Sequence, residues 1–251
     1  MIYNSEALIL STRHYGDTSL ICNLFTKEYG KLSIISKGAR TLKNPNRAIL
    51  QPAQFVDLHY YYKPGRNIQI LKEASINQHF FKIHQDYKKI ILSYNIIDIA
   101  NQICTTDNPN KIIFRLIKKV LNKIDLSNHQ DIHIYYVFFQ IQLLKYLGYQ
   151  PITEHCASCN TNLKQANYNF TLGQLTCSKC TQPHNYYKPL ILTTQLLQLI
   201  KKISNTHINV LNDNIHYTID ELNTLKQYLL YYLSFHIINI KHLKSMSLIK
   251  E

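Results

Sequence analysis

Cys156-Ala157-Ser158-Cys159 and Cys177-Ser178-Lys179-Cys180 are two C-x2-C pairs separated by 17 residues. Four of the six cysteines of this 251-residue chain therefore fall within 25 positions. The spacing is typical of a four-cysteine zinc site, because each turn points two thiolates to one side and Zn²⁺ prefers a tetrahedral sulfur cage. Residues 168–176 between the pairs alternate like a small hairpin. We predict an inserted zinc ribbon, with a structural Zn²⁺ bound by Cys156, Cys159, Cys177 and Cys180.

Two other interpretations of these cysteines are less favoured. Disulfides need an oxidising compartment, yet residues 1–6 lack the regions of a secretory signal, so we expect a reduced, cytoplasmic chain. Four unrelated cysteines would not be expected to form two equal pairs. A catalytic zinc needs an open coordination position, which would require His155 or His184 to replace one cysteine. The pattern therefore favours a structural metal.

The net charge of the chain is +13, and 45% of its residues are hydrophobic. The most apolar segment, 228–240, is interrupted by Ser234, His236 and Asn239, so we expect no membrane span. Four thiolates on Zn²⁺ would lower the charge to about +11. Such a charge attracts polyanions, nucleic acid first and an anionic membrane surface second. The abundance of Lys, Asn, Ile and Tyr is also typical of AT-biased coding, which accounts for part of the lysine excess.

The arginines are distributed unevenly. The chain has five, and four of them lie in the first 70 residues: Arg13, Arg40, Arg47 and Arg66. Arginine offers a planar fork of donors that suits phosphate. This clustering favours an anion-binding face in the N-terminal region.

Residues 2–76 show the short, alternating apolar pattern of β-strands. Five strands are predicted, at 2–10, 20–25, 31–36, 55–62 and 67–76, with turns at Tyr29-Gly30 and Pro64-Gly65. Five short strands in this length predict a small Greek-key barrel of the OB-fold type, and an SH3-like barrel would give a similar pattern. The alternation also predicts that at least one of Tyr60, Tyr61 and Tyr62 points into the core, while the others remain candidates for base stacking.

A basic segment follows the third predicted strand. Lys37-Gly38-Ala39-Arg40 is followed by Lys43 and Arg47. Glycine lets a backbone approach phosphate closely, and the cations supply charge, although basic runs are often only solvated surface loops. On a barrel suited to oligonucleotides, this segment predicts a DNA-binding site.

From Phe81 the apolar period becomes helical. One helix of roughly 20 residues is predicted from the Phe81–Ile83 region to Ile103, a second from Asn108-Pro109, with Pro109 in its first turn, and a third from near Asp131 to Gly148. Further helices are predicted at 193–203 and 222–240, the latter behind a Thr218–Glu221 capping box. The ribbon would then be inserted within one helical domain. We predict an α+β multidomain chain: an OB-fold at 1–80, helices at 81–150 and 188–251, and a zinc finger at 151–187.

No sequence motif of an enzyme is present. The chain lacks GxxxxGK[ST], GxGxxG, GxSxG and HExxH patterns, and its 15 acidic residues are scattered singly. Cys22 and Cys104 lie in apolar segments and are predicted to pack as small hydrophobic residues. We expect a binding protein, not an enzyme.

Several segments together resemble the bacterial recombination mediator family RecO. In chain order they are Glu6-Ala7-Leu8-Ile9-Leu10, Tyr15-Gly16-Asp17, Leu24-Phe25-Thr26-Lys27-Glu28-Tyr29-Gly30, Lys37-Gly38-Ala39-Arg40, Leu71-Lys72-Glu73-Ala74, C-x2-C-x17-C-x2-C and Leu243-Lys244-Ser245. One departure is Asp17, where the family commonly has glutamate. The resemblance covers nearly the whole chain.

This resemblance implies a function without enzymatic turnover. RecO-like proteins bind single- and double-stranded DNA and anneal complementary strands. With RecR, and with the acidic C-terminal tail of single-strand-binding protein (SSB), they help to load RecA onto gapped or broken DNA. The resemblance thus implies a bacterial, nucleoid-associated location and no membrane partner. The expected phosphate contacts are Arg13, Lys37, Arg40, Lys43, Arg47 and Arg66.

Two rival functions belong to other classes. OB barrels with zinc ribbons also occur in RNA-binding and translation-associated proteins, which would prefer structured RNA over single-stranded DNA. A zinc-dependent enzyme or a ligase accessory protein would show an open metal position or a nucleotide–lysine adduct. DNA mediation stays the leading hypothesis.

Overall fold

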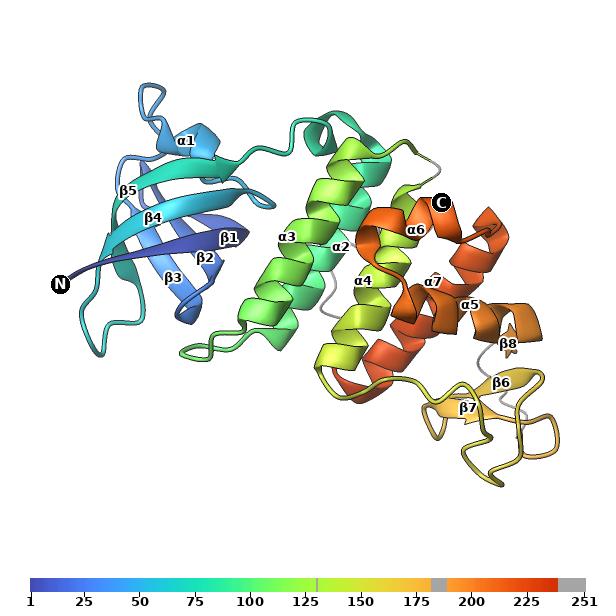
Figure 1. Ribbon diagram of the computed structural model, residues 1–251. Coiled ribbons are helices and arrows are strands. Elements are labelled where there is room, and N and C mark those ends of the chain that lie inside the picture. The colour runs from blue at the N-terminus through green and yellow to red at the C-terminus, as the bar shows by residue number, and fades with distance from the viewer. Residues whose placement is uncertain (130, 182–188, 239–251) are drawn as a thin grey trace. The chain divides into compact units, whose positions relative to one another are not determined.

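The computed structural model describes residues 1–129, 131–181 and 189–238 (Figure 1). The described residues form two compact units, 1–126 and 127–238. The first unit holds a β-barrel and two long helices, and the second holds helices and a small cysteine-rich sheet. The three-domain division at 1–80, 81–150 with 188–251, and 151–187 stays a prediction. The segment Leu243-Lys244-Ser245 and His184 lie outside the described residues.

Five strands close into the predicted barrel. They are β1 (Ile2–Tyr15), β2 (Ser19–Thr26), β3 (Gly30–Ser36), β4 (Phe55–Tyr61) and β5 (Gln69–Gln78). Their order around the barrel is β1-β2-β3-β5-β4, and only the β3–β5 pair is parallel. Because β5 lies between β3 and β4, the barrel is a Greek-key arrangement of the OB type rather than a simple meander.

The barrel interior follows from period-two alternation. On β2 the side chains of Leu20, Cys22 and Leu24 enter the core, while Asn23 between them faces outward. Burying such apolar side chains contributes roughly 1.5–3 kcal/mol each. Ile21 and Phe25 on the other face of β2 are also buried, so only Ser19 and Asn23 of this strand are partly exposed.

The helices of the first unit begin later than the sequence predicted. The short α1 (Asn46–Ile49) follows β3, and a 3-10 turn, η1 (Ile83–Gln85), precedes α2 (Tyr87–Ile103). The predicted helix start at Phe81–Ile83 is wrong, because the Asp86 side chain accepts the backbone N–H groups of Lys88 and Lys89 and caps the helix there. Pro109 likewise precedes α3 (Lys111–Leu126), since Asn110 Oδ1 accepts the N–H of Ile113.

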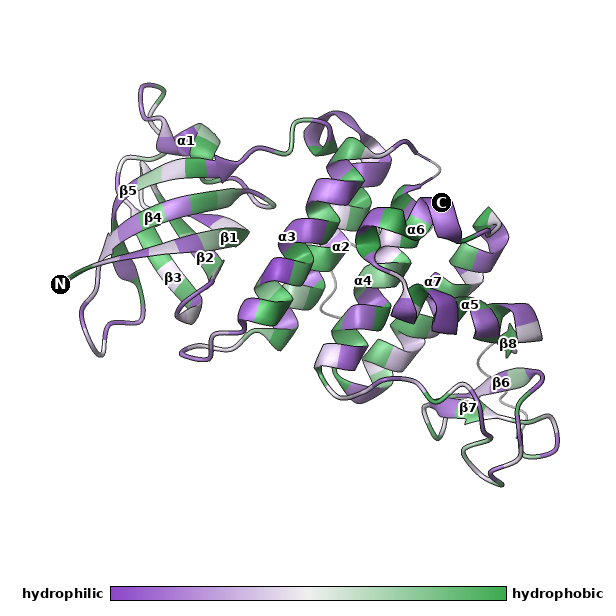
Figure 2. Ribbon diagram, in the orientation of Figure 1, coloured by the Kyte–Doolittle hydropathy of each residue, from purple (hydrophilic) through white to green (hydrophobic). Residues whose placement is uncertain are grey.

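Helix α3 packs directly on the barrel. The ring of Phe114 lies 5.5 Å from Phe25 and 5.4 Å from Phe55, measured between centroids. Figure 2 shows α3 carrying both hydrophobic and hydrophilic stripes, as expected of a helix with one buried face. Lys118 on this helix pairs with Glu6 of β1, and Lys27 pairs with the same carboxylate at 3.3 Å. Packing and a shared ion pair thus join helix and barrel into one unit.

The three long helices of the second unit lie where the sequence predicted, but the last of them ends at His236 and not at 240. The helices of this unit are α4 (Ile132–Tyr146), α5 (Thr194–Asn205), the 3-10 turn η2 (Ile208–Val210), α6 (Leu211–Asn214) and α7 (Ile219–His236). The predicted capping box of Thr218 and Glu221 is present, and Gly148 follows α4 with φ +81°. Among the described residues, none of the helices has the combination of length and apolar character that crossing a bilayer requires.

The predicted hairpin between the cysteine pairs is present. It consists of β6 (Ala166–Asn169) and β7 (Gln174–Thr176), and β8 (Ile191–Leu192) pairs with the other edge of β6. Asn169 Oδ1 accepts the N–H groups of Thr171 and Leu172 and so fixes the turn. We call residues 156–181, which include both cysteine pairs, the cysteine ribbon.

Candidate nucleic-acid interface and metal centre

The basic loop at 37–45 is anchored to the barrel by its backbone. Ala39 is fully buried in the barrel core, and the Arg40 N–H donates to Thr18 O at 2.8 Å. Gly38 adopts φ +67°, which favours glycine, and its carbonyl accepts the Thr41 N–H at 3.1 Å. The loop is therefore ordered while the side chains of Lys37 and Lys43 stay exposed.

Arg40 and Arg47 meet in a hollow at the end of the barrel. Its volume is about 310 Å³, and Thr12, His14 and Gln51 also line it. Arg40 Nη1 donates to Gly16 O at 3.2 Å, which holds the guanidinium beside the β1–β2 turn. A second hollow of about 450 Å³ adjoins it, with Lys43 on its wall and Arg47 and Gln51 shared by both.

Arg13 lies on a different face from this hollow. Thr12 and His14 point towards it, so strand alternation places Arg13 on the outer surface of β1. The outer surface carries a polar ladder, in which Asn23 bonds Ser11 Oγ at 3.0 Å and accepts from Ser33 Oγ at 2.7 Å. Arg13 therefore extends a polar outer face of β1, β2 and β3 and does not join Arg40.

Arg66 belongs to the turn between β4 and β5. Its carbonyl accepts from Gln69 Nε2 at 2.7 Å, and its own N–H donates to Lys63 O at 3.2 Å. The register pairs Leu20 with Ser36, so the β1–β2 and β3–α1 connections lie together, whereas Tyr61 pairs with Ile2, at the opposite end of β1 from the β1–β2 turn. The loop that carries Arg66 thus begins beside the N-terminus of β1, and Lys37, Arg40 and Lys43 lie on the connection that follows Ser36.

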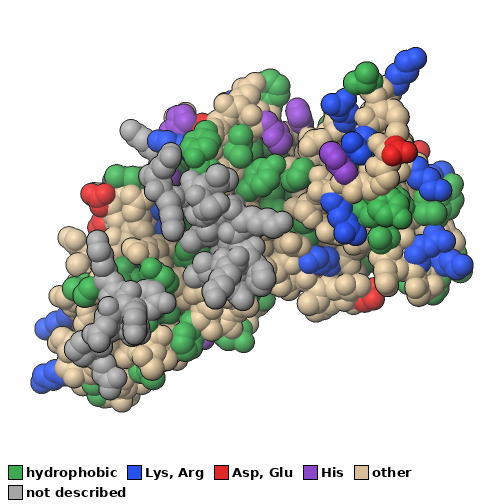
Figure 3. Space-filling view, turned by 180° about the vertical axis from the view of Figure 1, so that it is seen from behind, with side chains coloured by type: hydrophobic (Ala, Val, Ile, Leu, Met, Phe, Trp, Pro, Cys, Tyr) green, Lys and Arg blue, Asp and Glu red, His purple; other side chains and the backbone are tan. Residues whose placement is uncertain are grey.

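The six predicted DNA-binding cations lack carboxylate partners in the part of the chain that the structure describes. Its salt bridges involve other residues, such as the Lys27–Glu6 and Lys201–Glu154 pairs. In Figure 3, Lys and Arg side chains gather over the barrel at the right of the view, with fewer acidic side chains among them. Cations without acidic partners, such as Arg40, Lys43 and Arg47 in the two adjoining hollows, produce a positive local potential that attracts phosphate.

The three tyrosines at the end of β4 have different environments. Tyr60 is 1% exposed, and burial raises the pKa of its hydroxyl, so this residue is core and unavailable for stacking. Tyr62 is half-buried and stacks on Tyr3 with ring centroids 4.7 Å apart. Tyr61 is 45% exposed and is the one of the three whose ring is free of such packing in the described structure.

The four predicted metal ligands come together as a cluster. The Sγ atoms of Cys156, Cys159, Cys177 and Cys180 all lie within 4.8 Å of one another, and those of Cys159 and Cys177 are 3.7 Å apart. Bonds of 2.3 Å to a tetrahedral metal would place two sulfurs about 3.8 Å apart, whereas a disulfide requires about 2.05 Å. All six cysteines are free thiols. The sulfur geometry fits a metal ion and not disulfides.

The two turns of the cluster are shaped by backbone hydrogen bonds. Asn160 adopts φ +58°, and its N–H donates to Cys156 O at 2.9 Å. Cys156 Sγ accepts the Cys177 N–H at 3.3 Å, and the Cys180 N–H donates to Cys177 O at 3.0 Å. These contacts turn both thiol pairs towards one point.

The thiols of the cluster differ from the other two cysteines in acidity. Burial raises the pKa of Cys156, but the N–H groups of Cys177, Cys159 and Ser158 outweigh it and bring the pKa to about 6. Hydrogen bonding with the thiols of Cys159 and Cys177 raises the pKa of Cys180 to about 12. Burial raises the pKa of Cys22 and of Cys104 to about 12, although the charge of Lys31 opposes this at Cys104. A thiolate, the metal-binding form, is therefore favoured at Cys156 and not at Cys22 or Cys104.

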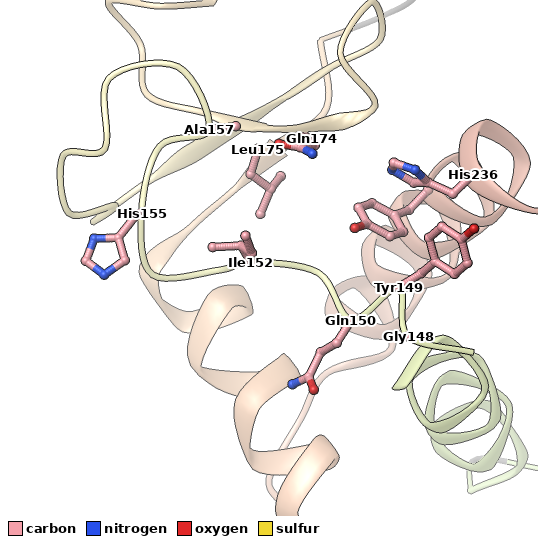
Figure 4. A pocket seen from close by; sticks show the side chains of 10 residues that line it. Gly148, Tyr149, Gln150, Ile152, His155, Ala157, Gln174, Leu175 and His236 are labelled. Carbon is pink, nitrogen blue, oxygen red and sulfur yellow. The ribbon is translucent and has the colours of Figure 1, made fainter. Parts of the chain in front are cut away.

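His155 does not belong to the sulfur cluster. It lines a hollow of about 280 Å³ between the cysteine ribbon and α7, with Tyr149, Ile152, Leu175 and His236 (Figure 4). There His236 Nε2 donates to Gly173 O at 3.0 Å, which ties the hairpin turn to α7. The open metal site that His155 would create is thus not favoured.

The sequence missed several residues that line the basic hollows. Thr12, His14 and Gln51 each lie on a wall beside Arg40 or Arg47. The alternation of β1 carries a signal for the first two, because they share a face, but the closeness of Gln51 depends on the path of the loop. Their hydroxyl, imidazole and amide groups offer hydrogen bonds beside the guanidinium groups.

Comparison with known proteins agrees with the sequence resemblance. The chain matches the family described as Recombination protein O N terminal over residues 1–80 and that described as Recombination protein O C terminal over residues 84–246. A DNA repair protein RecO of Chlorobium phaeobacteroides is 27% identical over 100% of this chain and 98% of that protein. Proteins of the same name from Thermodesulfovibrio yellowstonii and Salinibacter ruber are 27% and 30% identical, over 84% and 61% of this chain and 84% and 58% of their own.

Proposed function

Since the chain belongs to the recombination protein O (RecO) family of DNA repair proteins, we propose that it is a recombination mediator that anneals single DNA strands. It binds single- and double-stranded DNA through the barrel, with Arg13, Lys37, Arg40, Lys43, Arg47 and Arg66 as phosphate contacts. The observation that supports this site most strongly is the meeting of Arg40 and Arg47 in one hollow without a carboxylate partner among the described residues.

The mechanism we propose is electrostatic. Two complementary strands repel each other, and a protein that holds both lowers this repulsion by placing cations between them. Neutralising about 4–6 phosphates gives a log–log salt slope near −0.7 to −0.9 per phosphate, with little sequence preference. No bond is formed or broken, so the chain acts without turnover.

The partners we propose are those of a mediator. With RecR, and through the C-terminal tail of SSB, the protein helps to load RecA onto SSB-coated DNA at gaps and breaks. It acts in the bacterial cytoplasm, associated with the nucleoid. The cysteine cluster holds a structural Zn²⁺, because four thiolates match the preferences of that ion.

Annealing of complementary strands coated with their cognate SSB tests the proposed function. The Lys37→Ala/Arg40→Ala variant should lose most of the annealing rate, with a larger loss at low salt than at high salt, because it makes fewer salt-sensitive phosphate contacts than wild type. A matched control is Lys88→Ala/Arg115→Ala, which removes the same two charges from exposed positions of α2 and α3. Equal rates for both variants would contradict the assigned site, and tighter binding of structured RNA than of single-stranded DNA would favour the RNA-binding alternative.

A further inference from the structure

An apolar hollow adjoins the basic ones beside α1. Its volume is about 470 Å³, and its walls include Ile76, His79, Phe81 and His84. It shares Ala48 and Gln51 with the hollow beside Lys43, which in turn shares Arg47 and Gln51 with the hollow at Arg40. The three hollows form one continuous depression, which we call the α1 trough. One end of it is cationic and the other is aromatic.

The aromatic end is held in place by its neighbours in the chain. Phe80 is 1% exposed and packs on Phe55 at 5.9 Å, and the Ile83 N–H donates to Asp125 Oδ1 at 2.8 Å. Between these two anchors Phe81 is 59% exposed, with the His79 ring 5.9 Å away. A large aromatic side chain fixed towards solvent is typical of a binding site, because covering its apolar face with a ligand is energetically favourable.

One polar group of the trough also lacks a partner. Gln54 is 5% exposed, and its Nε2 donates to Ala48 O at 3.4 Å. Its Oε1 is buried without a hydrogen-bond partner in the described structure, and Gln54 is among the residues that line the apolar hollow. A buried acceptor without a donor is costly, so a ligand N–H group that reached this oxygen would remove that cost.

We propose that the α1 trough is the path of one DNA strand, with phosphates at Arg40 and Arg47 and an unpaired base stacked on Phe81. This proposal rests on the proposed function, since it takes the polyanion to be DNA. A nucleobase offers both the aromatic face that suits Phe81 and the N–H donors that suit Gln54. The strand is single, because the faces of paired bases in a duplex are covered by their neighbours. The cationic end of the trough thus contacts the phosphates of the DNA, and the aromatic end contacts a base.

Binding of a labelled oligothymidylate to the full, metal-loaded protein tests this path. Phe81→Ala should weaken binding about 10-fold, because stacking on one aromatic side chain contributes on the order of a factor of ten. The salt slope should not change, since no cation is removed. Tyr87→Ala is the matched control: Tyr87 is 58% exposed, close to the 59% of Phe81, but does not line the trough.

An oligomer of the same length without bases separates stacking from other effects. It keeps the phosphates but has nothing to stack, so wild type and Phe81→Ala should bind it equally. An equal loss on both oligomers would overturn the stacking role of Phe81.

The remaining outcomes distinguish this inference from the proposed function. If Phe81→Ala and Tyr87→Ala bind oligothymidylate alike while Lys37→Ala/Arg40→Ala is weakened, the aromatic end is not part of the path, and it would suit a peptide instead. If wild type itself fails to bind single-stranded DNA, both the proposed function and the proposed path of the strand along the α1 trough are wrong.

Discussion

The basic loop at 37–45 and the cysteine ribbon are both irregular, yet they are ordered by different means. The loop is held by buried Ala39 and by hydrogen bonds between backbone groups, so its cations are not needed for its own structure. The ribbon has strands of only 4 and 3 residues, and its four thiols point at one another. A loop that is ordered without its charges can offer them to a ligand, whereas the ribbon uses its reactive groups on itself.

The same contrast extends to the surrounding units. The barrel unit encloses a large apolar core and is joined to α3 by Phe114 and by the Glu6 ion pairs. The ribbon has only two short strands, and its four thiols could hold a metal ion, which would then supply much of its stability. Changes to the metal site and to the packing should therefore act on different parts of the molecule.

The largest expected effect is loss of the metal. Cys177→Ser should reduce bound Zn²⁺ from one ion per chain to none, because structural zinc contributes about 10–16 kcal/mol in small zinc-binding peptides. Hydrogen exchange in residues 156–181 should then become fast, while residues 2–15 of β1 stay protected. Ser158→Ala, an exposed position in the first turn, is the control and should keep the ion. Full protection of the ribbon without metal would show that the ribbon is ordered by its own packing.

The next effect is in the barrel, at Gly30. This residue adopts φ +74°, and a Cβ there would lie 2.7 Å from Asn108 N. Gly30→Ala should lower the free energy of unfolding by about 3 kcal/mol, combining backbone strain with a clash against main-chain atoms. Gly65 has a similar φ of +72° but open space around it, so Gly65→Ala should cost only about 1 kcal/mol. Urea unfolding gives the loss of unfolding free energy for each variant. Equal losses for Gly30→Ala and Gly65→Ala would rule out a clash with Asn108.

A smaller effect is expected at the shared ion pair. The Glu6 side chain is 14% exposed and binds both Lys27 and Lys118. Glu6→Gln should cost about 2 kcal/mol, because it leaves two cations facing a neutral amide in a poorly solvated position. Glu73→Gln should cost less than about 0.5 kcal/mol, since Glu73 is 64% exposed and lies 3.8 Å from His59. A loss at Glu6 no larger than that at Glu73 would show that packing alone joins α3 to the barrel.

The smallest effect is a pH dependence in the second unit. Burial lowers the pKa of Lys226 to about 8, although the side chain keeps some solvent contact. In the unfolded chain the pKa of this lysine is about 10.4. Between pH 8 and about 10.4 the unfolded chain therefore binds more protons than the folded chain. Stability relative to Lys226→Met should therefore rise with pH, by about 1 kcal/mol between pH 7 and 9. If the free energy of unfolding changes with pH in the same way for wild type and Lys226→Met, the pKa of Lys226 is not lowered.

Local patterns predicted the fold well where one segment determined its own structure. Alternation predicted the five strands, C-x2-C spacing predicted the sulfur cluster, and Thr218–Glu221 predicted a helix start. The start of α2 was missed because the apolar pattern at Phe81 and Ile83 continues through a 3-10 turn, and the Asp86 cap decides the boundary. Capping by a single side chain outweighed periodicity there.

The candidate site was less predictable, because it depends on which distant residues meet. The sequence grouped Arg13 with Arg40, but strand alternation places them on different faces. It gave no indication that Gln51 lines all three hollows, or that Lys118 reaches Glu6, 112 positions away. Such contacts follow from barrel closure and from the path of the loop.

The salt dependence of binding to single-stranded DNA tests the central claim most directly. We predict a log–log slope of about −3 to −5 for wild type, from about 4–6 neutralised phosphates. The Lys37→Ala/Arg40→Ala variant should have a slope shallower by about 1.4, whereas Lys88→Ala/Arg115→Ala should keep the wild-type slope. Equal slopes for the two double variants would contradict the claim that the basic loop at 37–45 binds the phosphates.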